Sequence, residues 1–338
     1  MYERLHFGER NISVLRVAYV LWAVVVATMV VMMAPTPAAA INNSANTLKV
    51  SPVRTDIEVQ AGTNKAVQVI VSNLTDSAMV VSPVINDFVS GDERGTPALI
   101  LDEEQLPSKH SLRQFMSPLP DVTIPPGEAK TVNVVIAVPE GTPAGGYFGA
   151  VRFAPSSPGD AGQVKLNASV ASLILLKVPG EITESIALTR SNIQQDGKTG
   201  SYFTDTDNIS FAFGFMNNGD AQIGPFGKIS LQKGDEVIHE SDFNDKSRRD
   251  VILPNSSRQW NTPLDKINGF GQYTVSATFT YGEKNQTIEV TKSFWVVPKS
   301  VIIMMIAGLL VVVGAIVGFV LFRRSRRRRR SSRYDRRL

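Results

Sequence analysis

The sequence predicts an all-β protein: two tandem immunoglobulin-like antiparallel β-sandwiches, with a signal or hydrophobic helix before them and a transmembrane helix after them. Three observations predict this fold. Short runs rich in Val, Ile and Phe, separated by Gly, Pro, Asn and Asp, fill residues 48–298. Two long uncharged apolar runs lie at the chain ends. Between these runs no window of useful length has the period of a helix.

The amino-acid composition alone excludes several kinds of functional site. The chain has 338 residues, no cysteine and three histidines, so disulfides, thiolate nucleophiles and Cys-ligated metals are excluded. Its formal net charge of +4 is an average over unlike parts. Residues 323–338 hold ten arginines against Asp335, whereas residues 41–299 hold 22 Lys/Arg against 28 Asp/Glu. The basic character therefore belongs to the tail, and the middle of the chain is mildly acidic.

The N-terminal segment, residues 1–40, is predicted to be an export signal. Arg16 precedes an apolar run over 17–34, and Pro35 and Pro37 then end any helix. Ala38 and Ala40 provide the small residues that a signal peptidase recognises, which predicts cleavage after Ala40. The run is longer than most signal cores, so an uncleaved anchor is the alternative. Both alternatives place residues 41–299 outside the cytoplasm.

The first predicted domain, residues 41–180, contains seven candidate strands. Each ends at turn-forming residues such as Gly62, Asn73 or Gly127. The candidate strands are 48–53, 57–60, 66–72, 79–90, 131–138, 147–153 and 164–178. The last run stops at Pro179-Gly180, where we place the domain boundary.

The second predicted domain, residues 181–298, also has about seven candidate strands. They are 182–188, 209–215, 227–231, 237–239, 251–253, 273–279 and 288–296. This is the strand count of an immunoglobulin-like sandwich. Tyr273 opens a strand in which alternate residues are apolar, and this position is typical of a tyrosine corner.

The C-terminal run, residues 301–322, is predicted to cross a membrane. Its 22 uncharged residues form a helix of roughly 33 Å, enough for the hydrocarbon core. The tail at 323–338 follows at once, and Arg323, Arg324, Arg326 and Arg327 begin a positive flank that predicts a cytoplasmic C-terminus. Trp295 suits the membrane interface. Anionic lipid of the inner leaflet is therefore the expected partner of the arginines, and nucleic acid is not, because no aromatic platform accompanies them.

The ectodomain offers no convincing catalytic or cofactor site. Acid pairs such as Asp235-Glu236 lie in turn-like segments, where adjacent carboxylates are ordinarily solvated. Asp205-x-Asp207-Asn208 resembles the start of a calcium loop but lacks the Gly and the distal Glu of an EF-hand. No G-x-S-x-G elbow, S-x-x-K pattern or phosphate-binding loop is present. We therefore predict no enzyme, no metal and no cofactor.

Aromatic side chains are the remaining candidates for ligand binding. Glycans and proteins are commonly held by exposed rings, which offer contact area at low entropic cost. The candidates are Phe115, Tyr147, Phe148 and Trp260, the last of which stands beside Arg258. The alternative for each is a place in a core. Tyr147 and Phe148 face opposite sides of one strand, so we expect at most one of them to be buried.

The first domain resembles a known family of bacterial surface proteins. The resemblance rests on Leu-Lys-Val-Ser-Pro52-Val-Arg, Asn86-Asp87-Phe88, Ile124-Pro-Pro-Gly127-Glu and Gly145-Gly146-Tyr147-Phe148-Gly149. These segments are similar to those of the DUF916 family, the WxL-interacting surface proteins. The resemblance implies a peptidoglycan-binding sandwich, a second sandwich for host or partner proteins, a span and a basic tail.

Two functions remain open from the sequence. The first is a single-pass bacterial surface protein, non-catalytic, that binds peptidoglycan or mediates adhesion. The second is a scaffold outside the cytoplasm that recruits other surface proteins through a strand edge or loops, without binding glycan. Glycan binding predicts that loop aromatics matter, and edge pairing predicts that they do not.

Overall fold

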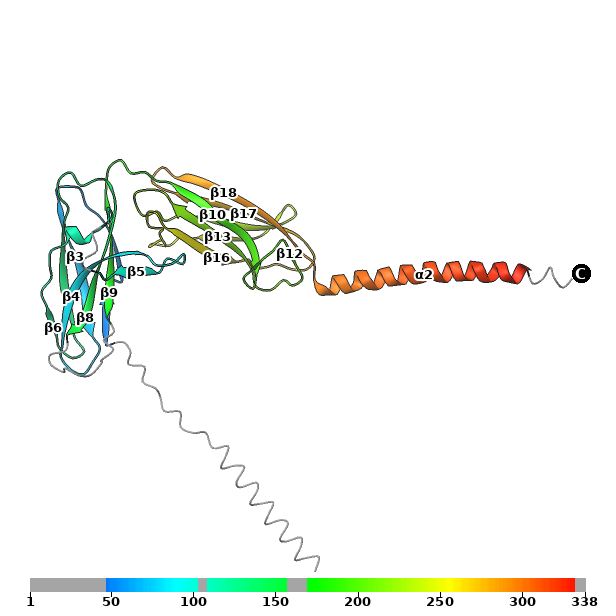
Figure 1. Ribbon diagram of the computed structural model, residues 1–338, viewed down its shortest axis with the longest axis horizontal. Helices are drawn as coiled ribbons and strands as arrows, with labels where there is room; N and C mark the ends of the chain where they lie inside the picture. Colours follow the sequence, from blue (N-terminus) through cyan, green and yellow to red (C-terminus); the bar gives the residue numbers. More distant parts are fainter. Residues whose placement is uncertain (1–46, 103–107, 157–168, 332–338) are drawn as a thin grey trace, which may run out of the picture. The chain divides into compact units, whose positions relative to one another are not determined.

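A computed structural model describes residues 47–102, 108–156 and 169–331. The fold is mostly β, with antiparallel pairing predominant, and it ends in one long helix (Figure 1). The expected signal segment and its Ala38 and Ala40 lie outside the described residues. So do 103–107, 157–168 and 332–338.

The strands before Val178 form two sheets around one core. One sheet has the order β1-β3-β7, and the other has the order β2-β9-β8-β4-β5, with β6 also paired to β4. Their bounds are β1 Leu48–Ser51, β2 Arg54–Glu58, β3 Asn64–Asn73, β4 Met79–Ser90, β5 Pro97–Ile100, β6 Val122–Ile124, β7 Ala129–Ala137, β8 Gly145–Ser156 and β9 Val170–Val178. Alternate residues of β3 and β7 are buried, as a sheet with one wet face requires.

The strands after Ile186 form a second pair of sheets, β11-β10-β13-β16 and β12-β18-β17-β14-β15. Their bounds are β10 Ile186–Gln195, β11 Lys198–Thr199, β12 Tyr202–Phe203, β13 Ile209–Asn217, β14 Phe226–Lys233, β15 Glu236–Phe243, β16 Ser257–Pro263, β17 Gly271–Tyr281 and β18 Gln286–Val296. Phe211, Phe213 and Phe215 of β13 fill this core together with Phe279 and Phe294. Aromatic packing therefore replaces the disulfide that a cysteine-free chain cannot form.

The tyrosine corner expected at Tyr273 is confirmed. The ring is fully buried at the start of β17, and its hydroxyl donates a hydrogen bond to the Asn268 carbonyl and accepts one from the Asn268 N–H. These hydrogen bonds connect the loop at Asn268 to the start of β17, as in other sandwiches with this feature.

Two expectations about strands were wrong. Residues 251–253 form no strand; only an isolated bridge joins Ile223 to Ile252. Pairing is also not wholly antiparallel, because β2 runs parallel to β9 and β12 runs parallel to β18. For the parallel pair of β2 and β9, the chain changes sheets between β1 and β2. The change occurs at a cis Ser51–Pro52 peptide bond.

Helix α2, Lys299–Ser331, follows β18 after Val297 and Pro298. Its Lys299–Arg323 portion is long and apolar enough to cross a membrane, and within the described residues it is the one helix that is. The helix extends beyond the predicted span at 301–322 because its backbone continues without a break through the first arginines of the tail.

Candidate functional site

The outer faces of β8 and β9 carry a second apolar layer. Val151 and Phe153 of β8 point into the first core, whereas Phe148 and Ala150 point the other way. Leu175 of β9 joins this outer cluster, and Val251 and Leu253 of the second sandwich pack against it. The two sandwiches therefore share a small apolar joint within the described residues.

Hydrogen bonds surround the apolar joint. The Gly146 N–H donates to the Asp220 carbonyl at 2.8 Å, and the Lys109 ammonium lies 3.2 Å from the Asp220 carboxylate. Arg54 donates to the Arg249 carbonyl at 3.0 Å, and the Lys177 side chain pairs with Glu283. The Gln259 N–H, on the edge of β16, donates to the Glu93 carbonyl at 2.6 Å. Charge and backbone contacts thus support the joint as well as apolar burial.

The Gly145-Gly146 pair has a structural reason in this joint. A Cβ atom on Gly145 would lie 3.0 Å from the Asp220 carbonyl oxygen. A Cβ atom on Gly146 would lie 2.7 Å from the Gln222 amide oxygen. Gly145 also has φ of +149°, where L side chains are rare. The pair allows the two sandwiches to approach closely and leaves no room for a ligand.

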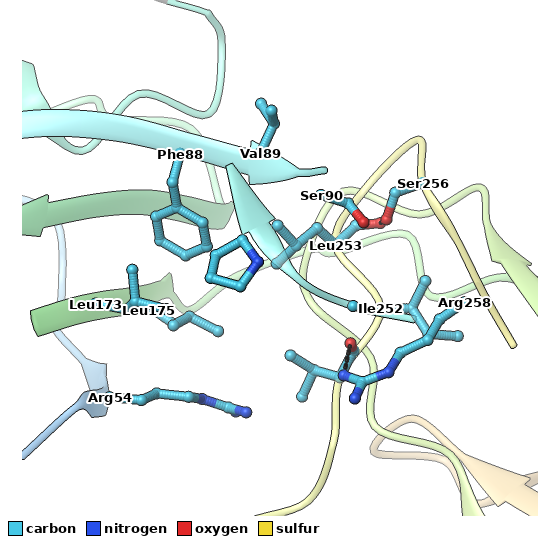
Figure 2. A pocket seen from close by; sticks show the side chains of 13 residues that line it. Arg54, Phe88, Val89, Ser90, Leu173, Leu175, Ile252, Leu253, Ser256 and Arg258 are labelled. Carbon is cyan, nitrogen blue, oxygen red and sulfur yellow. Dashed lines mark hydrogen bonds between the residues drawn. The ribbon is translucent and has the colours of Figure 1, made fainter. Parts of the chain in front are cut away.

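A pocket opens beside the joint, with an empty volume of about 470 Å³ including space open to solvent. Figure 2 shows its labelled side chains, which come from β2, β4, β9, the segment around Leu253 and, for Arg258, β16. Most of the lining is apolar: Phe88, Val89, Pro97, Leu173, Leu175, Val251, Ile252 and Leu253. A mainly apolar cavity with few polar groups at a domain junction is typical of binding sites.

Two arginines line the same pocket, and each is already paired. Arg54 makes two bonds to the Asp56 carboxylate, at 2.8 and 3.0 Å. Arg258 donates to the Val251 carbonyl at 3.0 Å (Figure 2). Its guanidinium also lies 3.2 Å from the Asp250 carboxylate. Asp56 pairs with Arg54, and Asp250 pairs with both Arg258 and Lys246, so neither pocket arginine is an unpaired cation. The mainly apolar lining therefore suits an apolar group better than a free anion.

The pKa of the Asp250 carboxyl reflects this pairing. Burial acts to raise the pKa, but the hydrogen bond from Lys246 and the charges of Arg258 and Lys246 outweigh it, so the pKa lies below its ordinary value. Asp250 is therefore ionised at neutral pH and keeps Arg258 in position beside the pocket.

The aromatic residues expected to bind ligand lie inside the protein. Phe115 and Tyr147 pack against each other in the first core, with ring centroids 5.0 Å apart, and the Tyr147 hydroxyl donates to the Pro143 carbonyl at 2.8 Å. Phe148 is buried in the joint. The expectation that at most one of Tyr147 and Phe148 is buried was wrong, because β8 is covered on both faces. Direct ligand binding by these rings stays a prediction.

Trp260 lies on β16 and is partly buried over the second core. Its ring packs edge-to-face on Phe243 at 5.3 Å, and the Arg258 guanidinium lies 5.3 Å from the ring centroid. The expected Arg258 neighbour is therefore present. Trp260 connects the core of the second sandwich to an arginine of the pocket.

The pocket was not predicted from the sequence, although one signal for its residues was present. Leu173-Ile174-Leu175-Leu176 is apolar at consecutive positions, the pattern of a strand buried on both faces. Arg54 and Arg258 carried no such signal. Among the described residues no group of three or more His, Asp or Glu side chains could hold a metal ion. That the protein is not an enzyme is still a prediction from the sequence.

No protein-family model matches the chain, and no curated protein matches it. Solved structures do. A chaperone–tip adhesin complex of CFA/I fimbriae biogenesis is similar at 16% identity and a TM-score of 0.37, over 73% of this chain and 99% of that one. The class 5 fimbriae chaperone CfaA is similar at 17% and 0.36, over 72% and 98%. The CsuC–CsuE chaperone–tip adhesion subunit complex of Acinetobacter baumannii is similar at 13% and 0.34, over 72% and 98%. Overlaps of this extent assign neither a ligand nor a partner.

Proposed function

We propose that the chain is a membrane-anchored, non-catalytic binding protein of a bacterial cell surface. Two tandem immunoglobulin-like sandwiches lie outside the cytoplasm, and the arginine tail lies inside. The apolar helix at Lys299–Arg323, followed at once by the arginines, supports this topology. The tyrosine corner supports the immunoglobulin-like assignment of the second sandwich.

The ligand that the geometry supports best is a partner protein, held at the pocket beside the joint. The observation that carries this proposal is the lining, in which apolar side chains from both sandwiches meet around two neutralised arginines. Such a cavity accepts an apolar side chain of a partner and leaves spare guanidinium N–H groups for its backbone carbonyls. Recruitment of another surface protein through loop contacts is thereby favoured over glycan binding.

Peptidoglycan is the second candidate, because the resemblance to WxL-interacting proteins implies it. With Phe115, Tyr147 and Phe148 buried, a glycan needs another surface. The outward face of β1, β3 and β7 is the alternative, since it carries exposed polar side chains beside exposed apolar ones. Gln68 lies opposite Asn133, and Ile70 lies opposite Thr131.

Photocrosslinking in cells that make the full chain tests the proposal. Leu253, in the pocket lining, is replaced by benzoylphenylalanine, and Leu188, exposed on β10, is replaced in a matched control. We expect a discrete protein adduct at position 253 that protease degrades and that is absent at position 188. An adduct released by lysozyme would favour peptidoglycan instead. Absence of any adduct at position 253, in a variant that keeps the parental Tm, would contradict the pocket as a binding site.

A further inference from the structure

Three aromatic side chains gather at the end of the second sandwich from which the apolar helix departs. Tyr202 is 75% exposed and Phe270 is 51% exposed, the largest exposures of any aromatic residue in the sandwiches. Trp295 is partly exposed, and its ring centroid lies 6.0 Å from that of Phe270. We call Tyr202, Phe270 and Trp295 the aromatic end.

The register of the strands places two of these rings on one face. Tyr202 is the direct partner of Trp295 in the parallel pair of β12 and β18, and the Trp295 N–H donates to the Ser201 carbonyl at 2.8 Å. Directly paired residues point to the same side of a sheet. The next residues, Phe203 and Val296, are buried and point into the core. The rings therefore lie on the outer face, fixed by the sheet.

The neighbouring residues of that outer face on β17 and β18 are polar. Next to Trp295 along β18 comes Ser293, whose hydroxyl is 3.0 Å from that of Thr274. Beyond it lies the exposed Thr291, opposite Ser276. Hydroxyl groups thus lie next to the aromatic end on β17 and β18, and rings replace them at the pair of Tyr202 and Trp295. The change from polar to aromatic side chains thus occurs at the end of β18, next to the start of helix α2.

The chain between the aromatic end and the apolar helix is too short to be a linker. The Val297 N–H still donates to the Phe203 carbonyl, at 2.8 Å, and the Val301 N–H already donates to the Pro298 carbonyl, at 2.9 Å. Five residues lie between Trp295 and Val301, so their Cα atoms are at most about 20 Å apart even when the segment is fully extended. The polar headgroup region adds only about 5–8 Å on each side of the hydrocarbon core. Because helix α2 already begins at Lys299, part of this segment is helical, and a span that begins near Val301 holds the aromatic end close to the membrane surface.

We propose that the aromatic end inserts into the headgroup region of the bilayer and seats the second sandwich on the membrane. Tyr and Trp favour this region because their rings are apolar and their polar atoms reach water. Phe270 adds apolar area, and Lys299, the first residue of α2, can extend its ammonium to the phosphates. Neutral lipid is sufficient, since the contact rests on rings. The inference rests on the proposed membrane anchoring and adds a second attachment to it.

The absence of cysteine makes the test direct, because single cysteines can be introduced and labelled without background. The full chain is reconstituted in phosphatidylcholine vesicles as Tyr202→Cys, Phe270→Cys, Thr291→Cys or Leu310→Cys, each carrying a nitroxide. Collision of the label with oxygen and with a water-soluble nickel chelate reports its depth. Tyr202 and Phe270 are exposed, so their replacement leaves the cores intact, and an unchanged Tm checks this.

We expect labels at positions 202 and 270 to collide less with nickel and more with oxygen than the label at Thr291. Values at 202 and 270 equal to those at 291 would overturn the inference. The Leu310 label separates membrane anchoring from insertion of the aromatic end. A label buried in the bilayer at 310, with labels exposed to water at 202 and 270, rejects insertion of the aromatic end and leaves the anchoring intact. An aqueous label at 310 rejects membrane anchoring itself.

A second variant tests whether the rings cause the seating. A nitroxide at the exposed Gln272, the β17 partner of Trp295, reports the same depth with all three rings intact. Combining Tyr202→Ser and Phe270→Ser should raise its nickel collisions to the level of the Thr291 label. The matched pair Leu188→Ser and Met216→Ser removes exposed apolar side chains from β10 and β13 in the other sheet and should leave the label unchanged. Equal effects of the two pairs would contradict a role for the rings.

Discussion

At the scale of single residues, each sandwich depends on one buried asparagine. Asn73 ends β3 and Asn217 ends β13, and both are fully buried. The Asn217 amide donates to the carbonyls of Ala221 and Ile252, at 2.8 and 2.9 Å, and its oxygen accepts the Gly219 N–H. Asn73 donates to the carbonyls of Ser77, in the loop that follows β3, and of Ile124 at the end of β6, and its oxygen accepts the Thr75 N–H. Each side chain thus supplies hydrogen-bond partners to backbone groups of the turns around the strand end.

We predict that Asn217→Ala lowers the free energy of unfolding by about 2–3 kcal/mol, because buried backbone groups lose their partners. Thermal unfolding of the full chain in detergent micelles, followed by circular dichroism, measures the change. Asn133→Ala is the control, since Asn133 is exposed on β7 and should change stability by about 0.5 kcal/mol or less. Equal losses for the two variants would show that the buried network contributes nothing.

Asp250 gives a prediction for pH dependence. Its folded-state pKa is lowered, so its contribution to stability is present above the unfolded pKa of about 3.9 and is lost as pH falls through the folded pKa. Asp250→Asn should destabilise at pH 7 by at most about 1 kcal/mol, because the carboxylate is one-third exposed. Urea unfolding of both proteins should then converge as the pH falls below the folded pKa. A constant difference across this range would contradict the ion pairing.

At the scale of elements, the sequence predicted the long strands because their apolar residues alternate or run together. The predicted strand 79–90 has the bounds of β4, Met79–Ser90. The strands that were missed have other sources of order. Ser257–Pro263 is polar, and forms β16 because β13 offers it an edge. Val251 and Leu253 looked like a strand but are apolar because they cover the joint. Tertiary contact, which local pattern does not encode, decided both cases.

The same reason explains which site residues could be anticipated. Phe148 is buried, and the pocket exists, because the second sandwich lies over β8 and β9. This contact joins segments about 100 residues apart in the sequence. The consecutive leucines of β9 were the only local trace of it. Arg54 and Arg258 are ordinary surface residues in the sequence and become pocket residues only through the joint.

Strand β8 therefore serves two layers, and substitutions on its two faces should act differently. Phe153→Ala opens the first core and should cost about 3–5 kcal/mol of the stability of that sandwich. Phe148→Ala removes a ring from the joint and should instead uncouple the sandwiches. Calorimetry of the full chain is expected to show separated transitions for Phe148→Ala. A single transition shifted as far as that of Phe153→Ala would contradict the division of roles.

At the scale of the whole molecule, the two candidate ligands make opposite demands on the surface. A partner protein needs the pocket at the joint, which both sandwiches build together. Peptidoglycan, as the family resemblance implies, needs only the first sandwich, where the outward face of β1, β3 and β7 offers exposed polar side chains such as Gln68 and Asn133. Which surface binds therefore also decides whether the joint is functional or only structural.

Co-sedimentation of the full chain in detergent micelles with purified cell-wall sacculi distinguishes these demands. We expect the chain to stay in the supernatant, because the rings suited to stacking on sugars, Phe115, Tyr147 and Phe148, are enclosed by packing. Pelleting that Gln68→Ala with Asn133→Ala abolishes, and that Thr278→Ala with Thr291→Ala leaves intact, would reverse the preference. Both pairs remove exposed polar side chains from a sheet face, so only a ligand on the first sandwich separates them. In that case the pocket would be a gap at a structural joint, and the adduct expected at Leu253 should be absent.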